Sequence, residues 1–233
     1  MNIEMGCLQS LIESIESHFN NGTSTSTMMN SVAQHLKDFG ALGMRSFITE
    51  VLQKPALLSK IAHQSYLHKN GFYKVPLAIH PNFSLRLHVW LPGTCSLETL
   101  HDHRWYLAST ILTGTLQSEI WQSSVRSDAQ FYDEYLYVDK DTEPTYLGKA
   151  KVAMEKTVKR EAGEAYVLNP GTLHRIIAHG NALTATLMCR SHCVQNWSRN
   201  IIVNQLIPDV KPNYLTPAGL ETVLKNYLTQ AAL

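Results

Sequence analysis

The 233-residue sequence contains no hydrophobic run long enough to cross a membrane, almost no net charge and few cysteines. A membrane-spanning helix needs about 20 consecutive apolar residues, so we expect no membrane association. Lysine and arginine number 20 against 19 aspartates and glutamates. Because a basic surface is missing, we expect no nucleic-acid partner. Four cysteines do not form a dense disulfide framework, and the first residues lack a basic-then-apolar secretion signal, so we predict a cytoplasmic protein.

The sequence also lacks a glycine-rich phosphate loop, a Gly-x-Ser-x-Gly turn and internal repeats. These absences argue against a nucleotide hydrolase of the P-loop type and against a serine hydrolase of the α/β type. The length suits one well-buried domain.

Three regions follow one another along the chain. Residues 1–71 carry apolar side chains at helical spacing, which predicts helices, one ending at Gly40 and another before Gly71. Residues 72–208 are short β-rich runs separated by turns, with the most charged stretch, 123–161, expected as outer hairpins or loops rather than as a second domain. Residues 209–233 return to a helix capped by Thr216, with Pro217 at its first position.

The segment "LHDHRW" places His101 and His103 one residue apart. Strand alternation sends both imidazoles to one face and Asp102 to the other. Two histidines on one face can begin a metal site, or they can be exposed residues at a strand entrance. The later segment "NPGTLHR" adds His174 after a turn, and three nitrogen ligands with open positions suit Fe(II) best, with nickel, copper or zinc less specific.

These segments resemble the two motifs of the cupin superfamily. Gly93, His101, His103 and Gly114 match the first motif, although the usual glutamate after the second histidine is missing; Gly163, Pro170, Gly171 and His174 match the second. The resemblance implies an antiparallel cupin-type β-barrel (jelly roll), here with N-terminal helices and a C-terminal helix.

"LHDHRWYLASTILTGTLQSEIW" and "TLHRIIAHGNALTATLMCRS" are more specifically similar to cysteine dioxygenase and its thiol dioxygenase relatives. That resemblance implies Fe(II) held by His101, His103 and His174, and reaction of O2 with a small substrate. Three family positions differ here: Val75 replaces the arginine that binds the substrate carboxylate, Ala108 replaces the crosslinking cysteine, and Met188 to Arg190 stand where a tyrosine is expected. We therefore expect free cysteine not to be the preferred substrate.

Other side chains can replace the missing groups. In "FSLRLHVW", Arg86 and His88 share one strand face, which points either into the barrel or, on an edge strand, to solvent. Trp105 shares the face of the two histidines and either walls the pocket or packs as core. Tyr73 and Arg190 complete the candidate substrate-binding residues, with Lys74 as an alternative cation to Arg86; Tyr106 is expected in the core and Arg175 in an ion pair.

The leading hypothesis is a non-haem Fe(II) oxygenase that acts with O2 on a small metal-chelating thiol, amine or amino-acid-like substrate. The second hypothesis is a redox-neutral metal-dependent lyase or isomerase, with Tyr73, Tyr106 or His88 as acid or base. The third is a non-catalytic cupin that binds a small ligand. We expect a monomer or a small homo-oligomer.

Overall fold

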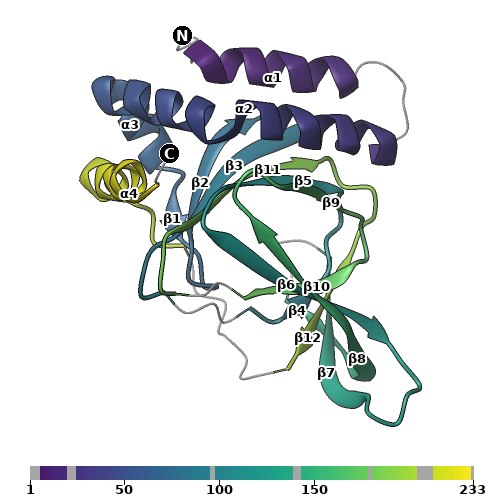
Figure 1. Cartoon of the computed structure of the whole chain (residues 1–233). Coiled ribbons are helices and arrows are strands. Elements are labelled where there is room, and N and C mark those ends of the chain that lie inside the picture. The colour runs from purple at the N-terminus through teal and green to yellow at the C-terminus, as the bar shows by residue number, and fades with distance from the viewer. Residues whose placement is uncertain are drawn as a thin grey trace.

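Four helices and twelve strands make up the described part of the computed structural model, which comprises residues 6–19, 25–94, 98–138, 143–177, 180–203 and 212–231. The helices form a layer over one face of a six-stranded sheet, and a second set of strands closes the barrel on its other side (Figure 1). None of the helices in these ranges is long and apolar enough to span a membrane.

The helical layer consists of α1 (Gly6–Phe19), α2 (Thr25–Gln53), α3 (Pro55–Ala62) and α4 (Pro217–Gln230). Gly40 was predicted to end a helix, and the structure agrees: Gly40 is non-helical (φ +50°, ψ −159°), so α2 consists of two helices joined at a kink. The predicted helix before Gly71 is shorter than expected, because α3 ends at Ala62 and a short strand follows. The start of α4 agrees with the prediction: the Thr216 side chain accepts a hydrogen bond from the Gly219 amide, and a proline begins the helix.

The first sheet packs against these helices. Its strand order is β1-β2-β3-β11-β5-β9, with bounds Tyr66–Leu67, Tyr73–Ile79, Phe83–Trp90, Thr184–Ser191, Leu107–Thr113 and Ala165–Leu168. Alternate residues of β3, namely Leu85, Leu87 and Val89, are fully buried in one core with side chains of α2 such as Phe47 and Ile48. The intervening residues of β3 therefore face the barrel interior.

The second group of strands forms a closed ring in the order β10-β4-β12-β7-β8-β6. Their bounds are Leu173–Ile177, Leu100–His101, Ser198–Ile202, Gln130–Tyr137, Thr145–Glu161 and Thr115–Ser123. The charged stretch, which was expected as outer hairpins or loops, forms the paired strands β7 and β8, which project away from the helices (Figure 1); its residues 139–142 lie outside the described ranges. The prediction of a mainly antiparallel cupin-type barrel with N-terminal helices and a C-terminal helix is confirmed.

One glycine carries the chain from the first sheet to the second. Residues 107–122, expected as one β-rich run, are two strands, β5 and β6, divided at Gly114. Gly114 has φ +73°, and an added Cβ would collide with the carbonyl oxygen of Leu183. A side chain here is excluded by both backbone conformation and space, so this matched glycine of the first motif has a structural role.

Candidate metal centre

Three histidines converge in the interior of the barrel. His101 on β4 is the antiparallel pairing partner of His174 on β10. His103 follows two residues after His101, and one ligand nitrogen from each ring lies within 4.8 Å of the other two. The expectation of one strand carrying both His101 and His103 was wrong, because β4 ends at His101. The loop after β4, rather than strand alternation, brings His103 to the other two rings.

Backbone carbonyls orient two of the rings. His101 Nδ1 lies 3.0 Å from the carbonyl oxygen of Thr99, and His174 Nδ1 lies 2.8 Å from that of Thr172. In a neutral imidazole, an N–H at Nδ1 leaves a lone pair at Nε2. A hydrogen bond from the second ring nitrogen to a carbonyl is the usual support of a metal-binding histidine. Both rings are thus prepared to offer Nε2 to a metal.

Burial keeps two of the imidazoles neutral. It lowers the pKa of His174 to about 3, with the neighbouring His101 adding to the effect. The pKa of His103 lies well below its usual range because of burial and then the charges of His101 and His174, with smaller effects from Arg86 and Lys74. Since a metal binds the neutral form of imidazole, these rings need lose no proton at neutral pH. The donor set fits a divalent metal that accepts three nitrogen ligands, and His101, His103 and His174 would hold it.

The loop between the first two histidines is held by a buried ion pair. Asp102 accepts hydrogen bonds from the backbone amide of Arg199 at 2.6 Å and from its Nε at 3.0 Å. The Asp102 side chain is fully buried, whereas that of Arg199 is about a quarter exposed. This contact ties the His101–His103 loop to β12, and the aspartate of "LHDH" therefore acts as a positioning residue.

We predict that Asp102→Ala weakens metal binding by about 10- to 100-fold and lowers the free energy of unfolding by about 2 kcal/mol. The Arg199 amide would lose its acceptor, and the loop carrying His103 would be less fixed. Metal titration and urea denaturation measure the two effects. The control is Asp133→Ala, which removes an exposed ion pair with Lys149 and should change stability by less than about 0.5 kcal/mol. Equal effects of the two substitutions would contradict the role of Asp102.

Sequence reasoning missed a buried carboxyl group beside the site. Glu98 is 6% exposed and accepts a hydrogen bond from the Ile176 amide at 2.6 Å. Burial raises its pKa, while the nearby His101 lowers it. Glu98 precedes the first histidine by three residues, whereas the cupin motif places its glutamate after the second, so motif spacing held no signal for it. Glu98 is not part of the three-residue ligand group.

Four of the five candidate substrate-binding residues are on the barrel side. Trp105 stacks on His103 with centroids 5.3 Å apart, and the Arg190 guanidinium lies 4.6 Å from the centre of the Trp105 ring. Arg86 and His88 occupy the interior face of β3, which lies between β2 and β11. The alternative of a solvent-facing edge strand was therefore wrong.

Tyr73 is on the other side of the first sheet. It pairs with Val89 and packs against the helical core, away from the three histidines. The structure does not support Tyr73 as a substrate-binding or acid–base residue. Tyr106 also packs against this core, as expected, and Arg175 forms the expected ion pair, 2.7 Å from Glu119.

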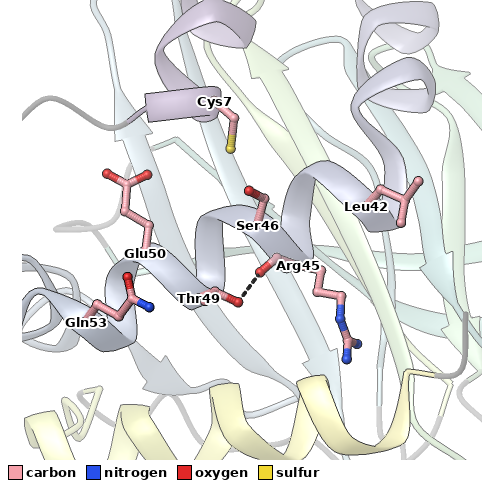
Figure 2. Close-up of a pocket in the computed structure, with 7 residues that line it drawn as sticks. All are labelled: Cys7, Leu42, Arg45, Ser46, Thr49, Glu50 and Gln53. Carbon is pink, nitrogen blue, oxygen red and sulfur yellow. Dashed lines mark hydrogen bonds between the residues drawn. The ribbon is translucent and has the colours of Figure 1, made fainter.

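A separate hollow of about 510 Å³ lies beside α2 and the start of α1 (Figure 2). Its polar side chains bind within the helical layer: Thr49 donates to the Arg45 carbonyl, Arg45 donates to Leu228 of α4, and Glu50 pairs with Lys54. The hollow is lined by residues at the start of α1 and on α2, whereas His101 and His174 belong to β4 and β10, which lie across the first sheet from these helices (Figure 1). We therefore assign it no part in the metal centre.

No family model matches the chain, and no curated protein matches it. Among solved structures, oxalate decarboxylase from Bacillus subtilis at pH 4.6 is similar at 14% identity and TM-score 0.34, over 55% of this chain and 26% of that one. Lactobacillus farciminis oxalate decarboxylase is similar at 13% identity and TM-score 0.35, and the match spans 55% of this chain and 30% of that one. The Schizosaccharomyces pombe Cnp3 cupin domain is similar at 9% identity and TM-score 0.29, and the match spans 52% of this chain and 60% of that domain. The chain thus spans about a quarter of the first of these proteins, and at this level of similarity none of them indicates its chemistry.

Proposed function

We propose that the protein is a non-haem Fe(II)-dependent oxygenase that acts with O2 on a small metal-chelating substrate. The observation that carries this proposal is the group of three histidines, two of them held neutral by burial and two oriented by backbone carbonyls, with no carboxylate in the ligand group. The resemblance of "LHDHRW" and "TLHR" to thiol dioxygenases adds support. When bound there, Fe(II) would supply open coordination positions and redox chemistry toward O2.

The chain's own residues would bind and enclose the substrate. Trp105, stacked on His103, forms one wall beside the open side of the site. Arg86 and Arg190 offer planar guanidinium groups that can hold a substrate carboxylate in two parallel hydrogen bonds. Apolar side chains from both sheets exclude water from the interior, among them Phe72, Trp90, Ile111 and Leu116. His88, on the same face of β3 as Arg86, completes the proposed substrate-binding side chains.

The test is oxygen consumption. Protein loaded anaerobically with Fe(II) is mixed with a panel of thiols, amines and amino acids, and O2 uptake is followed with an electrode. His174→Gln serves as the metal-free comparison, and the exposed His192→Ala as the control. Uptake that requires both substrate and His174 supports the proposal, whereas metal-dependent turnover under anaerobic conditions would contradict it.

A redox-neutral lyase or isomerase is the second candidate because one interior side chain has acid–base character. Burial, with Arg86 and Arg190 adding to it, lowers the pKa of Lys74 to about 7. A group with a pKa near the working pH is suited to transferring protons. Anaerobic turnover that Lys74→Met abolishes would favour this candidate. Ligand binding without turnover would favour the third candidate, a non-catalytic protein that binds a small ligand.

We predict that free cysteine is a poor substrate. Val75, at the position of the family's arginine, is 1% exposed and belongs to the helical core. A cysteine bound as in that family would place its carboxylate at Val75, away from Arg86 and Arg190, and would lose a charge-assisted contact. In a desolvated site that loss costs on the order of 2–5 kcal/mol, which lowers kcat/KM by at least about tenfold. Sulfinate formation from cysteine is measured against the best substrate of the panel. Cysteine turning over as well as that substrate would refute the prediction.

A further inference from the structure

Three cationic side chains lie on the interior face of the first sheet. Lys74 on β2 pairs with His88 on β3, and Arg190 on β11 pairs with Ser84 on β3. Arg86 lies between His88 and Ser84 on the same face of β3. Diagonal neighbours in an antiparallel sheet are roughly 7–8 Å apart. Lys74, Arg86 and Arg190 therefore form one compact group across three adjacent strands, which we call the cation cluster.

The cluster adjoins the metal centre. Arg190 lies over Trp105, and the same ring stacks on His103. The charges of Arg86 and Lys74 also act on the His103 imidazole. One indole thus joins a candidate metal ligand to a member of the cluster, and a small molecule bound at the metal can extend toward these cations.

The cluster has no carboxylate partner among the residues that the structure describes. Arg190 donates to the Ser84 hydroxyl at 3.0 Å, and Lys74 lies over the Tyr66 ring at 5.4 Å. Nearby carboxylates bind other groups: Asp102 pairs with Arg199, Glu119 pairs with Arg175, and Glu98 accepts a hydrogen bond from the Ile176 amide. Buried like charges without a counter-ion are costly, and a bound anion would relieve that cost.

Buried ring nitrogens without partners lie next to the cation cluster. Trp105 Nε1 and His88 Nε2 are inaccessible to solvent and have no hydrogen-bond partner in the described ranges. Trp105 contacts the cluster through Arg190, and His88 lies opposite Lys74. Because buried polar groups are normally hydrogen-bonded, these atoms point independently to a missing polar ligand.

We propose that the cation cluster of Lys74, Arg86 and Arg190 binds a second anionic group of the substrate, a carboxylate or a phosphate, while the first group chelates the metal. The substrate is therefore a chelator with at least two negative charges. This inference rests on the proposed function for the identity of the site, and it adds the chemical class of the substrate. A simple amino acid fits less well, because it offers only one carboxylate to three cations.

The experiment titrates metal-free protein with inorganic phosphate, malonate and acetate, with calorimetry and tryptophan fluorescence as readouts. We expect phosphate or malonate to bind more tightly than acetate, and Arg86→Met to weaken that binding at least about tenfold. Arg86→Lys should restore it only in part, since an ammonium cannot reproduce the planar fork of the guanidinium. Preference for phosphate assigns a phosphorylated substrate, and preference for malonate assigns a dicarboxylate.

Arg126→Met is the matched control, because Arg126 is exposed and pairs with Asp128; it should leave anion binding unchanged. Arg190→Met is the second test variant should Arg86→Met fail to fold. Absence of phosphate and malonate binding by the unsubstituted protein, or equal binding by Arg86→Met and Arg126→Met, would overturn the inference. Anion binding without iron binding would uphold the cluster and refute the oxygenase. Oxygen uptake without anion binding would uphold the oxygenase and refute the cation cluster as an anion-binding site.

Discussion

His174→Gln is expected to reduce bound iron from about one Fe(II) per chain to background, with affinity lowered by more than about 100-fold. The substitution removes one of three imidazole donors from a group whose ligand atoms lie within 4.8 Å of one another. Two remaining nitrogens do not complete the three-residue set that occupies one face of an iron site. His101→Gln should have the same effect. Iron is measured after anaerobic reconstitution and desalting.

The control for this experiment is His192→Ala, since His192 is exposed directly after the end of β11 and lies outside the ligand group. Circular dichroism and thermal unfolding establish that the glutamine variants remain folded. Unchanged iron content in both His101→Gln and His174→Gln would eliminate this metal centre. Loss of iron in His192→Ala as well would show that the assay reports general instability.

Lys74→Met is expected to stabilise the metal-free protein at pH 7 and to remove part of its pH dependence. The pKa of Lys74 falls from the ordinary 10.5 to about 7, chiefly through burial and then through Arg86 and Arg190. Between pH 7 and about pH 10, the unfolded chain therefore binds more protons at this lysine than the folded chain does. Stability contributed by this group rises with pH through that window and is lowest below pH 7.

The size of the effect follows from this difference in pKa. Each unit corresponds to about 1.4 kcal/mol, so Lys74→Met should raise the free energy of unfolding at pH 7 by about 2–4 kcal/mol after allowance for partial exposure. The charges of Arg86 and Arg190 act on this amine, and the centre of the Tyr66 ring lies 5.4 Å from it. Burial and then the charge of Lys74 in turn lower the pKa of His68 and of His88. Urea unfolding at pH 7 and pH 10 measures the change.

The matched control is Lys159→Met, because Lys159 is exposed and pairs with Glu161. It should alter stability by less than about 0.5 kcal/mol at either pH. A destabilised Lys74→Met protein at pH 7, with the pH dependence of the parent retained, would show that Lys74 is not held in an unfavourable charged form. If the same substitution also weakens phosphate or malonate binding, then the Lys74 side chain lowers the stability of the folded protein and strengthens the binding of the anion.

Local patterns predicted much of the fold because they act over a few residues. Alternation in "FSLRLHVW" separated Leu85 and Leu87 from Arg86, and the structure places those leucines in the helical core and the arginine on the barrel side. The Thr216 cap was also predictable, since its partner amide is three residues away. The end of α3 was not, because β1 forms there by pairing with β2 and by bridging Tyr66 to Tyr214.

Strand alternation, turn residues and histidine spacing are local properties of the chain, and they predicted the type of fold and singled out His101, His103 and His174. Tertiary structure decided how those histidines meet: His101 and His174 are brought together by pairing of β4 with β10, across 73 positions of sequence. It also decided that Tyr73 faces the helices while Lys74 joins Arg86 and Arg190. The physical reason is that strand register, set by the packing of the whole barrel, determines which distant side chains share a face.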